Sequence, residues 1–456
     1  MDHPGLQAGP KRVLLLLILF ITSNAQKYFK PDGMRLIYSS GISFYYLFLR
    51  IAGLYSIKAR AWHYGRKDLF DKLSEVFTAH YASDDPAPVA WFHCASLGEF
   101  EQGRPVIEAF RAKFPGHTIL LTFFSPSGYN HKQQYKGADH IFYLPIDTMI
   151  NARRFVAITR PQFAVFIKYE FWFNYLNELF KHHIPVFTVS AIFRPNQHFF
   201  KGYGGWFRTH LRKINRVFVQ DPESAELLEM IDVKNVTVSG DTRFDRVTAI
   251  KAIQQPFPHI DRFTSGQHVV VAGSTWPPDD QLLFSLQEKT GDQIKFIIAP
   301  HEINLTYIHE LVAKLGDKAV LYSEAPGTDL GKKQFLIIDS VGILSQLYRY
   351  ASIAYIGGGF GTGIHNTLEA AAYGVPIFFG PNYQRFREAR EMTEAGLAFC
   401  VQNSNELTLG IIGLLSNQSH LEEVSHKAGE YVRSKTGATT IIIDELSRQI
   451  YSGQIQ

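Results

Sequence analysis

Cysteine and charge are both scarce in this sequence. Its 456 residues include only Cys94 and Cys400, which lie far apart, fit neither a disulfide scaffold nor a zinc site, and suit a reducing compartment. Charged residues make up 19%, and a net charge of +4 is too small to indicate nucleic-acid binding by itself. Hydrophobic residues make up 46% and aromatic residues 14%. The chain can therefore bury a sizeable core, and the excess of rings indicates either a very aromatic core or a surface that contacts lipid.

An apolar run near the N-terminus, residues 13–21, is too short to span a bilayer. It follows Lys11 and Arg12 and precedes a passable cleavage site at residues 23–25, a pattern typical of a secretory signal. We prefer the alternative that Met34 is the true start and that residues 1–33 form an upstream extension, because of the segment that follows.

The segment from Met34 to Lys67 is basic and aromatic and contains no acid. Its basic residues are Arg35, Arg50, Lys58, Arg60, Arg66 and Lys67. Such a segment can lie on an anionic bilayer surface, with its cations beside the lipid head groups. The alternative is an ordinary first helix that packs on its own domain. Arg50, in the middle of the segment, argues against a helix that spans the membrane.

Short apolar runs alternate with stretches long enough for a helix through the rest of the chain. The runs are residues 89–93, 118–123, 163–167, 186–189, 217–219 and 236–238, and then 269–272, 296–299, 335–338, 353–356, 376–379 and 397–400. This pattern is typical of parallel sheets covered by helices on both faces. We predict an α/β protein with two doubly wound, Rossmann-like domains, residues 34–245 and 246–456, joined by a linker near residues 245–267.

Ligands of such folds bind beyond the C-terminal ends of the strands, so polar side chains that directly follow a strand are candidates for catalysis. Glu99 follows the first run and could act as a general base on a hydroxyl, or it could be a helix-start acid favoured by the helix dipole. Glu170 follows the third run. Arg243 could neutralise a leaving phosphate or form a surface salt bridge. Ser125, after the second run, could bind a ligand or simply cap a helix.

A second basic stretch, Arg194–Arg216, contains no acid and interleaves cations with aromatic rings. We predict that it binds an amphiphile with phosphate groups through Arg194, Arg208 and Arg212. Single-stranded RNA could use the same composition, but we predict no nucleic-acid partner.

The densest motif is Ile356–Pro381, in which three glycines directly follow a strand. Glycines let a ligand approach the backbone closely, and the N-terminus of the helix that follows favours a phosphate. Asn366 lies near the start of that helix, and Glu369, one turn in, could bind ribose hydroxyls. The spacing is not the G-x-G-x-x-G of dinucleotide-binding folds, which argues against a nicotinamide oxidoreductase.

Together these blocks resemble the Kdo transferases, the 3-deoxy-D-manno-octulosonic acid transferases of lipopolysaccharide assembly. The matching blocks are residues 96–99, 122–128, 169–172, 240–245, 273–275 and 357–381, preceded by a start similar to the family's at Met34–Tyr38. The resemblance implies the GT-B fold, two Rossmann-like domains with a cleft between them. It implies inverting transfer of Kdo from CMP-Kdo to a lipid A precursor, lipid IVA, at the cytoplasmic face of the bacterial inner membrane. No Asp-x-Asp-like metal site stands out in the sequence, so we expect no metal in the transfer site, and no cofactor besides the donor CMP-Kdo.

By this resemblance Glu99 is the catalytic base, and Glu170 and Arg243 stabilise the transition state. The CMP-binding residues that it implies are His301, Glu302, Val341, Gly342, Ile343, Asn366, Thr367, Leu368 and Glu369. The family commonly has other residues at His301, Glu302, Ile343 and Thr367, and Lys168 replaces a frequent acid. Two alternatives remain open: a GT-B enzyme with another nucleotide-sugar donor, and a catalytically silent membrane-binding protein.

Overall fold

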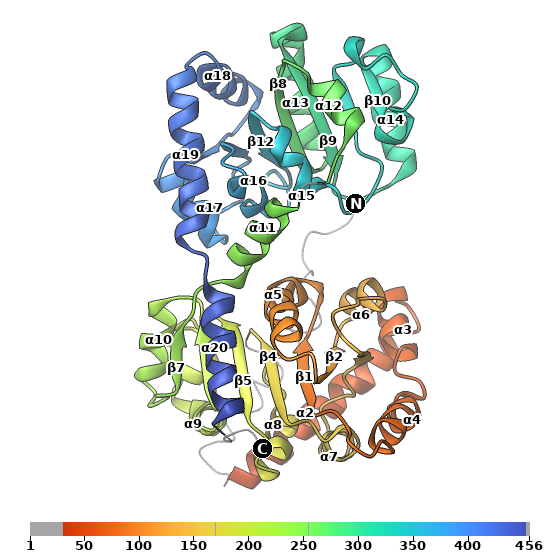
Figure 1. Cartoon of the computed structure of the whole chain (residues 1–456), viewed down its shortest axis with the longest axis vertical. Helices are drawn as coiled ribbons and strands as arrows, with labels where there is room; N and C mark the ends of the chain where they lie inside the picture. Colours follow the sequence, from red (N-terminus) through yellow and green to blue (C-terminus); the bar gives the residue numbers. More distant parts are fainter. Residues whose placement is uncertain (1–30, 169, 254, 453–456) are drawn as a thin grey trace. The chain divides into compact units, whose positions relative to one another are not determined.

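The computed structural model describes residues 31–168, 170–253 and 255–452, and it contains two compact α/β units (Figure 1). The first unit comprises Met1–Thr242 and Gly437–Gln456, and the second comprises Arg243–Thr436. The proposed extension, residues 1–33, lies outside the described residues except for its last three, which begin the first helix, α2 (Pro31–Ala52).

The first unit is built on a seven-stranded parallel sheet with the strand order β3-β2-β1-β4-β5-β6-β7. Its strands are β1 Val89–Cys94, β2 Thr118–Phe123, β3 His140–Tyr143, β4 Phe163–Ile167, β5 Val186–Ala191, β6 Arg216–Val219 and β7 Val236–Val238. Its helices are α2, α3 Ile57–Tyr64, α4 Leu69–Tyr81, α5 Leu97–Lys113, α6 Pro126–Lys132, α7 Met149–Thr159, α8 Phe173–Lys181, α9 Gly205–Leu211, α10 Pro222–Glu229 and α20 Ala438–Tyr451.

Both faces of this sheet are buried, because successive side chains of a strand point to opposite faces. In β1, Val89 and Trp91 pack in a core with α2, α4, α7 and α8, whereas Ala90 and Phe92 pack in a second core with α5 and α20. The near-continuous apolar runs of the sequence are therefore strands with helices on both sides.

The last helix, α20, belongs to the first unit although it follows the second unit in the chain (Figure 1). Ile442, Ile443 and Leu446 are buried in the core that α5 also covers. Two ion pairs, Lys113–Asp444 at 3.0 Å and Arg216–Glu445 at 3.2 Å, join α20 to the same unit. The predicted second domain, residues 246–456, is therefore wrong at its C-terminal end.

The second unit has a parallel sheet of the same size, with the order β10-β11-β9-β8-β12-β13-β14. Its strands are β8 His268–Thr275, β9 Ile294–Pro300, β10 Ala319–Leu321, β11 Phe335–Ile337, β12 Ile353–Ile356, β13 Ile377–Phe379 and β14 Ala398–Cys400. Its helices are α11 Thr242–Ala252, α12 Pro258–Thr264, α13 Pro277–Thr290, α14 Leu305–Leu315, α15 Leu344–Leu347, α16 Leu368–Ala372, α17 Arg387–Glu394, α18 Ser404–Leu415 and α19 Gln418–Ser434.

The prediction of two doubly wound, Rossmann-like units is confirmed, and every predicted apolar run lies in or overlaps a strand. The predicted linker is displaced, because the chain passes from the first unit to the second at Thr242 and Arg243. Residues 258–264 form α12, whose Ile260 and Phe263 are buried in the second unit. Within the described residues, no helix combines the length and the hydropathy needed to cross a membrane.

The strand orders fix where each unit can bind a ligand. In the first sheet the order reverses between β1 and β4, and in the second it reverses between β8 and β12. Loops that leave neighbouring strands at such a point diverge to opposite faces and open a crevice at the carboxyl edge of the sheet. The loops after β1, β4, β8 and β12 are therefore the positions of greatest functional interest.

Candidate active site

Glu99 lies at the switch point of the first sheet, in the first turn of α5 directly after β1. Ser96 donates a hydrogen bond from its Oγ to Glu99 Oε2, which fixes one carboxylate oxygen. Lys168 follows β4 on the other side of the switch point, and its Nζ lies 4.0 Å from Glu99 Oε1. The Glu99 side chain remains 15% exposed. A partly solvated carboxylate with one oriented oxygen is suited to accept a proton from a ligand hydroxyl.

A buried histidine holds the loop after β4 in place. The Trp172 indole donates from Nε1 to His93 Nε2 over 3.0 Å, so the proton of the neutral His93 ring must be on Nδ1. Nδ1 lies 2.9 Å from Thr122 Oγ1 of β2. Residues of β1, β2 and the loop after β4 are thus tied together beneath Glu99 and Lys168. His93 and Trp172 were not singled out from the sequence, and only the position of His93 at a strand end could have indicated them.

Glu170 lies on the side of this loop that faces α2. Its charge is one of the causes that raise the pKa of Tyr45 to about 12, after burial. It also contributes to raising the pKa of Tyr38, for which burial and Asp147 are the larger causes. Glu170 is therefore close to α2 as well as to the end of β4.

Ser125 is a helix cap, the simpler of the two interpretations of its block. Its Oγ accepts a hydrogen bond from the Ser127 backbone N–H over 3.3 Å at the start of α6.

Arg243, in the first turn of α11, forms a bidentate ion pair with Glu388 of α17. Its two terminal nitrogens lie 2.8 and 3.3 Å from the two Glu388 oxygens. The Glu388 side chain is only 7% exposed, whereas that of Arg243 is 31% exposed. The pair orients the guanidinium, and the exposed part of Arg243 remains accessible from solvent.

The three predicted CMP-binding blocks lie at one edge of the second sheet. His301 and Glu302 follow β9, and the block Val341–Ile343 lies in the loop after β11. The block Asn366–Glu369 spans the end of the loop after β12 and the start of α16. The carboxyl ends of parallel strands meet at the same edge, so these blocks are brought to the side where the switch point opens.

Three rings stack at this edge. The rings of Trp276 and His301 lie 4.9 Å apart and those of His301 and His365 lie 4.2 Å apart, both nearly parallel. The Trp276 Nε1–H donates to His365 Nε2 over 3.4 Å. Burial, His301 and Arg385 lower the pKa of His365 to about 4, so its ring is neutral at physiological pH. Trp276 was missed from the sequence, although it directly follows β8 at the switch point.

Asn366 and Glu369 interact with each other. The Asn366 amide donates to Glu369 Oε1 over 3.0 Å, and its Oδ1 accepts from the Leu368 backbone N–H over 3.1 Å. Asn366 therefore already satisfies one N–H at the start of α16, a helix of five residues. Thr367 is buried, and its Oγ1 has no hydrogen-bond partner within the described part of the chain.

The glycines after β12 make room for neighbouring backbone. A Cβ on Gly357 would lie 2.3 Å from the Ser274 carbonyl oxygen, and one on Gly359 would lie 2.5 Å from the Gly380 nitrogen. These glycines let the loops after β8, β12 and β13 pack in contact. Loop packing is thus one physical reason for glycine at these positions.

The three arginines predicted to bind the acceptor are not brought together. Arg194 follows β5 at the carboxyl edge, whereas Arg212 lies just before the amino end of β6. The Arg212 guanidinium donates to the Ile231 carbonyl over 2.8 Å, and Arg208 donates to the carbonyls of Phe199 and Lys201, each over 3.1 Å. The rings between these arginines are largely core: Phe199, Trp206 and Phe207 are buried.

The two sheets define a protein of the GT-B class, and the comparisons with known proteins agree. The structure of UDP-GlcNAc 2-epimerase from Neisseria meningitidis superposes with a TM-score of 0.55 at 15% identity, covering 79% of this chain and 100% of that one. A UDP-N-acetylglucosamine 2-epimerase structure superposes with a TM-score of 0.54 at 13% identity, covering 80% of this chain and 96% of that one. At this identity the likeness concerns the fold alone.

Sequence comparisons find matches to one family of proteins. Residues 71–246 match the family described as 3-deoxy-D-manno-octulosonic-acid transferase (kdotransferase). The chain is 27% identical to the 3-deoxy-D-manno-octulosonic acid transferase of Aquifex aeolicus over 350 residues, 75% of this chain and 89% of that protein. It is 23% identical to the Haemophilus influenzae protein of the same name over 415 residues, which are 88% of this chain and 95% of that protein. The resemblance to the Kdo transferases is thereby confirmed, and the activity that these matches support is Kdo transfer.

Proposed function

We propose that this protein transfers Kdo from CMP-Kdo to a lipid A precursor, lipid IVA, with inversion at the anomeric carbon. The observation that carries the proposal is the position of Glu99 beyond β1, oriented by Ser96 and within the segment that matches the family. A carboxylate in this position can take the proton from an acceptor hydroxyl. The hydroxyl oxygen then bonds to the anomeric carbon, and CMP leaves with the electron pair of the bond that breaks.

The second unit supplies the donor site in this proposal. Flat aromatic surface is what a nucleobase needs for stacking, and Trp276, His301 and His365 offer it at the switch point. Glu369, oriented by Asn366, is suited to accept hydrogen bonds from ribose hydroxyls. Arg243, held by Glu388, would offset the negative charge that develops on the leaving phosphate. Lipid-linked transfer from a different nucleotide sugar is the alternative.

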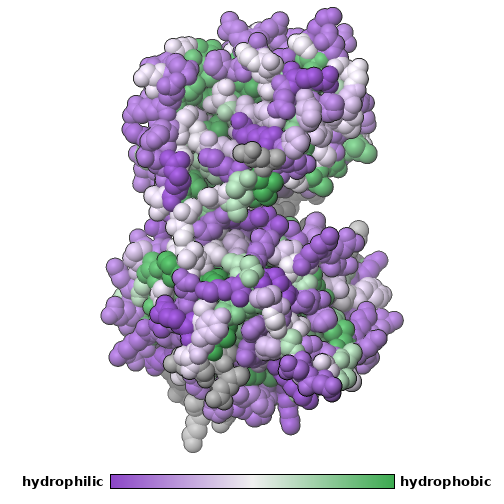
Figure 2. Space-filling model, viewed as in Figure 1, coloured by the Kyte–Doolittle hydropathy of each residue, from purple (hydrophilic) through white to green (hydrophobic). Residues whose placement is uncertain are grey.

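We further propose that α2 holds the protein on the cytoplasmic face of the inner membrane. One side of α2 packs on the first unit through Met34, Tyr38 and Ile42. The residues of α2 that are large, apolar and more than half exposed are Leu36, Phe44, Leu47, Phe48 and Ile51. By contrast, the surface visible in Figure 2 is mostly hydrophilic, with apolar side chains in small groups. An apolar helix face of this kind is suited to lie among lipid head groups without crossing the bilayer.

The test is incubation of the purified protein with CMP-Kdo and lipid IVA, followed by mass spectrometry of the lipid. A mass increase of one or more Kdo units supports the proposal. Parallel reactions with UDP- and ADP-sugars, and competition by free CMP, address the alternative. If lipid IVA is modified from another donor and CMP does not compete, the donor assignment is wrong.

A further inference from the structure

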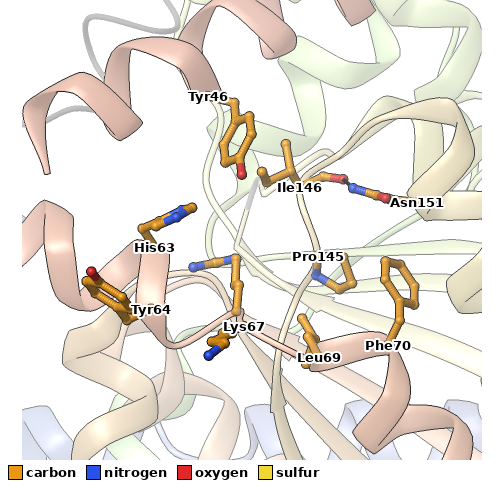
Figure 3. Close-up of a pocket in the computed structure, with 10 residues that line it drawn as sticks. Tyr46, His63, Tyr64, Lys67, Leu69, Phe70, Pro145, Ile146 and Asn151 are labelled. Carbon is orange, nitrogen blue, oxygen red and sulfur yellow. Dashed lines mark hydrogen bonds between the residues drawn. The ribbon is translucent and has the colours of Figure 1, made fainter.

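A pocket of about 400 Å³ in the first unit takes no part in the roles assigned so far (Figure 3). Its walls come from α2, from the end of α3 and the turn after it, from the start of α4, from the loop after β3, and from α7. The residues that line it include Tyr46, His63, Arg66, Lys67, Ile146 and Asn151. Tyr46 and His63 point toward the same space, and Ile146 and Asn151 lie on the other side of it (Figure 3).

The guanidinium of Arg66 forms part of the wall of this pocket, and it is held in position by three carbonyl oxygens. Nε donates to the Leu144 carbonyl over 3.0 Å, Nη1 donates to the Trp62 carbonyl over 2.9 Å, and Nη2 donates to the Phe124 carbonyl over 2.6 Å. It also lies over three aromatic rings, at 4.0 Å from the centre of the Trp62 ring. The expectation that the cations of this segment face lipid is therefore wrong for Arg66.

Within the described part of the chain, no carboxylate balances the charge of Arg66. Among the described residues no Asp or Glu forms an ion pair with Arg66, and the groups that favour its charged form are tyrosines. Burial lowers the pKa of Arg66 to about 9, which leaves it charged at physiological pH. Asp147, the acid beside the pocket in sequence, accepts instead from Tyr38 and from the backbone N–H groups of Asn174 and Tyr175. A half-buried cation without an anion is unfavourable, and a bound anion would remove that cost.

Two further observations indicate what kind of anion fits. Lys67 is exposed where it lines the pocket, which adds a second cation, and N–H groups on both Nη atoms of Arg66 remain for a ligand. Tyr46, in the pocket wall, belongs to the helix whose other side exposes Phe44 and Leu47. A molecule with a phosphate in the pocket can therefore keep an apolar part near the exposed side of α2.

The pocket also lies at a useful distance from Glu99. Pro145 and Ile146 follow β3, which is two strands away from β1 in the sheet. Neighbouring strands are about 4.8 Å apart, so the two strand ends are separated by about 10 Å. A phosphorylated sugar or disaccharide spans this distance.

We propose that this pocket binds a phosphate group of the lipid acceptor, with Arg66 and Lys67 as its cationic contacts. The inference rests on the proposed function, since it requires a phosphorylated lipid as the acceptor. The proposed phosphate site therefore lies on the β3 side of the switch point between β1 and β4, and it replaces the site predicted at Arg194, Arg208 and Arg212.

The main test is the Lys67→Glu variant, because Lys67 is exposed and its change leaves the core intact. We expect the KM for the phosphorylated acceptor to rise between about 5-fold and 30-fold, with kcat and the KM for CMP-Kdo unchanged. Lys72→Glu is the control, since Lys72 is an exposed lysine of the neighbouring helix α4 that does not line the pocket. With an acceptor from which the phosphates have been removed, the wild type and Lys67→Glu should have the same KM.

A second variant tests the pocket without changing its charge. Ile146→Trp fills the space from the wall, and we expect a similar rise in the acceptor KM. Arg66→Gln alone would be ambiguous, because it also removes hydrogen bonds to three carbonyls that hold the fold together.

Membrane phospholipids carry the same head-group chemistry, and vesicles separate the two sources. Ile146→Trp should bind vesicles with and without anionic phospholipid as the wild type does. If it loses the preference for anionic vesicles while the acceptor KM stays unchanged, or if neither variant alters the acceptor KM, the proposal is overturned. If the wild type transfers Kdo to neither acceptor, the proposed function fails instead, and direct binding of the phosphorylated lipid to the wild type and Lys67→Glu still tests the pocket.

Discussion

The carboxylate of Asp279 accepts a 2.9 Å hydrogen bond from the backbone N–H of Gly358, so the start of α13 holds the loop that follows β12. The same oxygen accepts from the backbone N–H of Trp276, and the other oxygen accepts from the Tyr355 hydroxyl. Asp279 is 1% exposed. One buried carboxylate thus sets the positions of Trp276 and of the glycine loop, which belong to the proposed donor site.

Replacing Asp279 by alanine should weaken nucleotide binding and destabilise the second unit. The change leaves two backbone N–H groups and one hydroxyl without their acceptor, at a cost of at least about 2 kcal/mol in the free energy of unfolding. We expect the Kd for CMP, measured by calorimetry, to rise at least tenfold. Tyr355→Phe, which removes one hydroxyl, is the control and should change the CMP Kd less than threefold. An unchanged CMP affinity in the alanine variant would show that Asp279 does not position the site.

The Glu99→Gln variant should fold, bind CMP with unchanged affinity and lose transfer. Glutamine can still accept the Ser96 hydrogen bond but cannot take a proton, and loss of a general base typically lowers kcat by about 10²–10⁴-fold. Glu101→Gln is a matched control on the same helix, because Glu101 pairs with Lys132 in a partly exposed ion pair of small energetic value. If Glu99→Gln retained more than about a third of the wild-type turnover, another group would be the base.

Variants of Arg243 and of Glu388 should separate a catalytic role of Arg243 from a purely structural one. Arg243→Gln removes the cation, so turnover should fall by about 10²-fold or more if this charge acts on the leaving phosphate. Glu388→Gln leaves the cation in place and should keep most of the turnover, while both variants lower the midpoint of denaturant unfolding because the pair is half-buried. Equal losses of turnover in the two variants would mean that only the ion pair matters.

The free energy of unfolding of the first unit should decrease as the pH is lowered from 6.5 to 4, in part because of His210. Burial lowers the pKa of His210 from 6.5 to about 4. In this interval the unfolded chain binds a proton that the folded protein does not, so the free energy of unfolding decreases as the pH falls. This residue contributes at most about 1.4 kcal/mol per pH unit. A His210→Gln variant should therefore show a flatter pH dependence in chemical denaturation, and an unchanged slope would contradict the assignment.

The exposed side of α2 should bind lipid vesicles. The double variant Leu47→Ser, Phe48→Ser removes two large apolar side chains, and vesicle affinity in a sedimentation assay should drop at least about tenfold. Transfer to detergent-dispersed acceptor should be retained, because these side chains are exposed and lie outside the core. The control is Leu409→Ser, at a 73% exposed leucine of α18. If both variants bind vesicles equally well, α2 is not the membrane contact.

Most of the fold could be predicted because its strands are buried on both faces and appear as apolar runs. The strands β3 (His140–Tyr143) and β10 (Ala319–Leu321) were missed. Both lie at a sheet edge and are short. β3 contains a histidine and a tyrosine and is only partly buried, whereas β10 is apolar and buried but only three residues long. The packing of α20 on the first unit was also missed, because an amphipathic helix pattern does not indicate which core the helix packs against.

The candidate site was predictable where a residue directly follows a strand, as for Glu99, Glu170 and His301. Trp276 and Asp279 were overlooked, because stacking and buried hydrogen bonds depend on loops that are distant in sequence. The position of Arg66 was also predicted wrongly, because its contacts come from distant parts of the chain. Its sequence context is that of a surface cation, and only the folded chain brings the carbonyls of Phe124 and Leu144 to it.

The return of α20 to the first unit has a consequence for how the protein is made. Ile442, Ile443 and Leu446 cover Phe92, Val106 and other residues of a core that is otherwise complete by residue 242. During synthesis this core therefore stays open until the whole second unit has left the ribosome. The first unit should depend on chaperones for most of translation, and a fragment that ends at Thr242 should aggregate, whereas adding the 438–451 peptide in trans should restore its solubility.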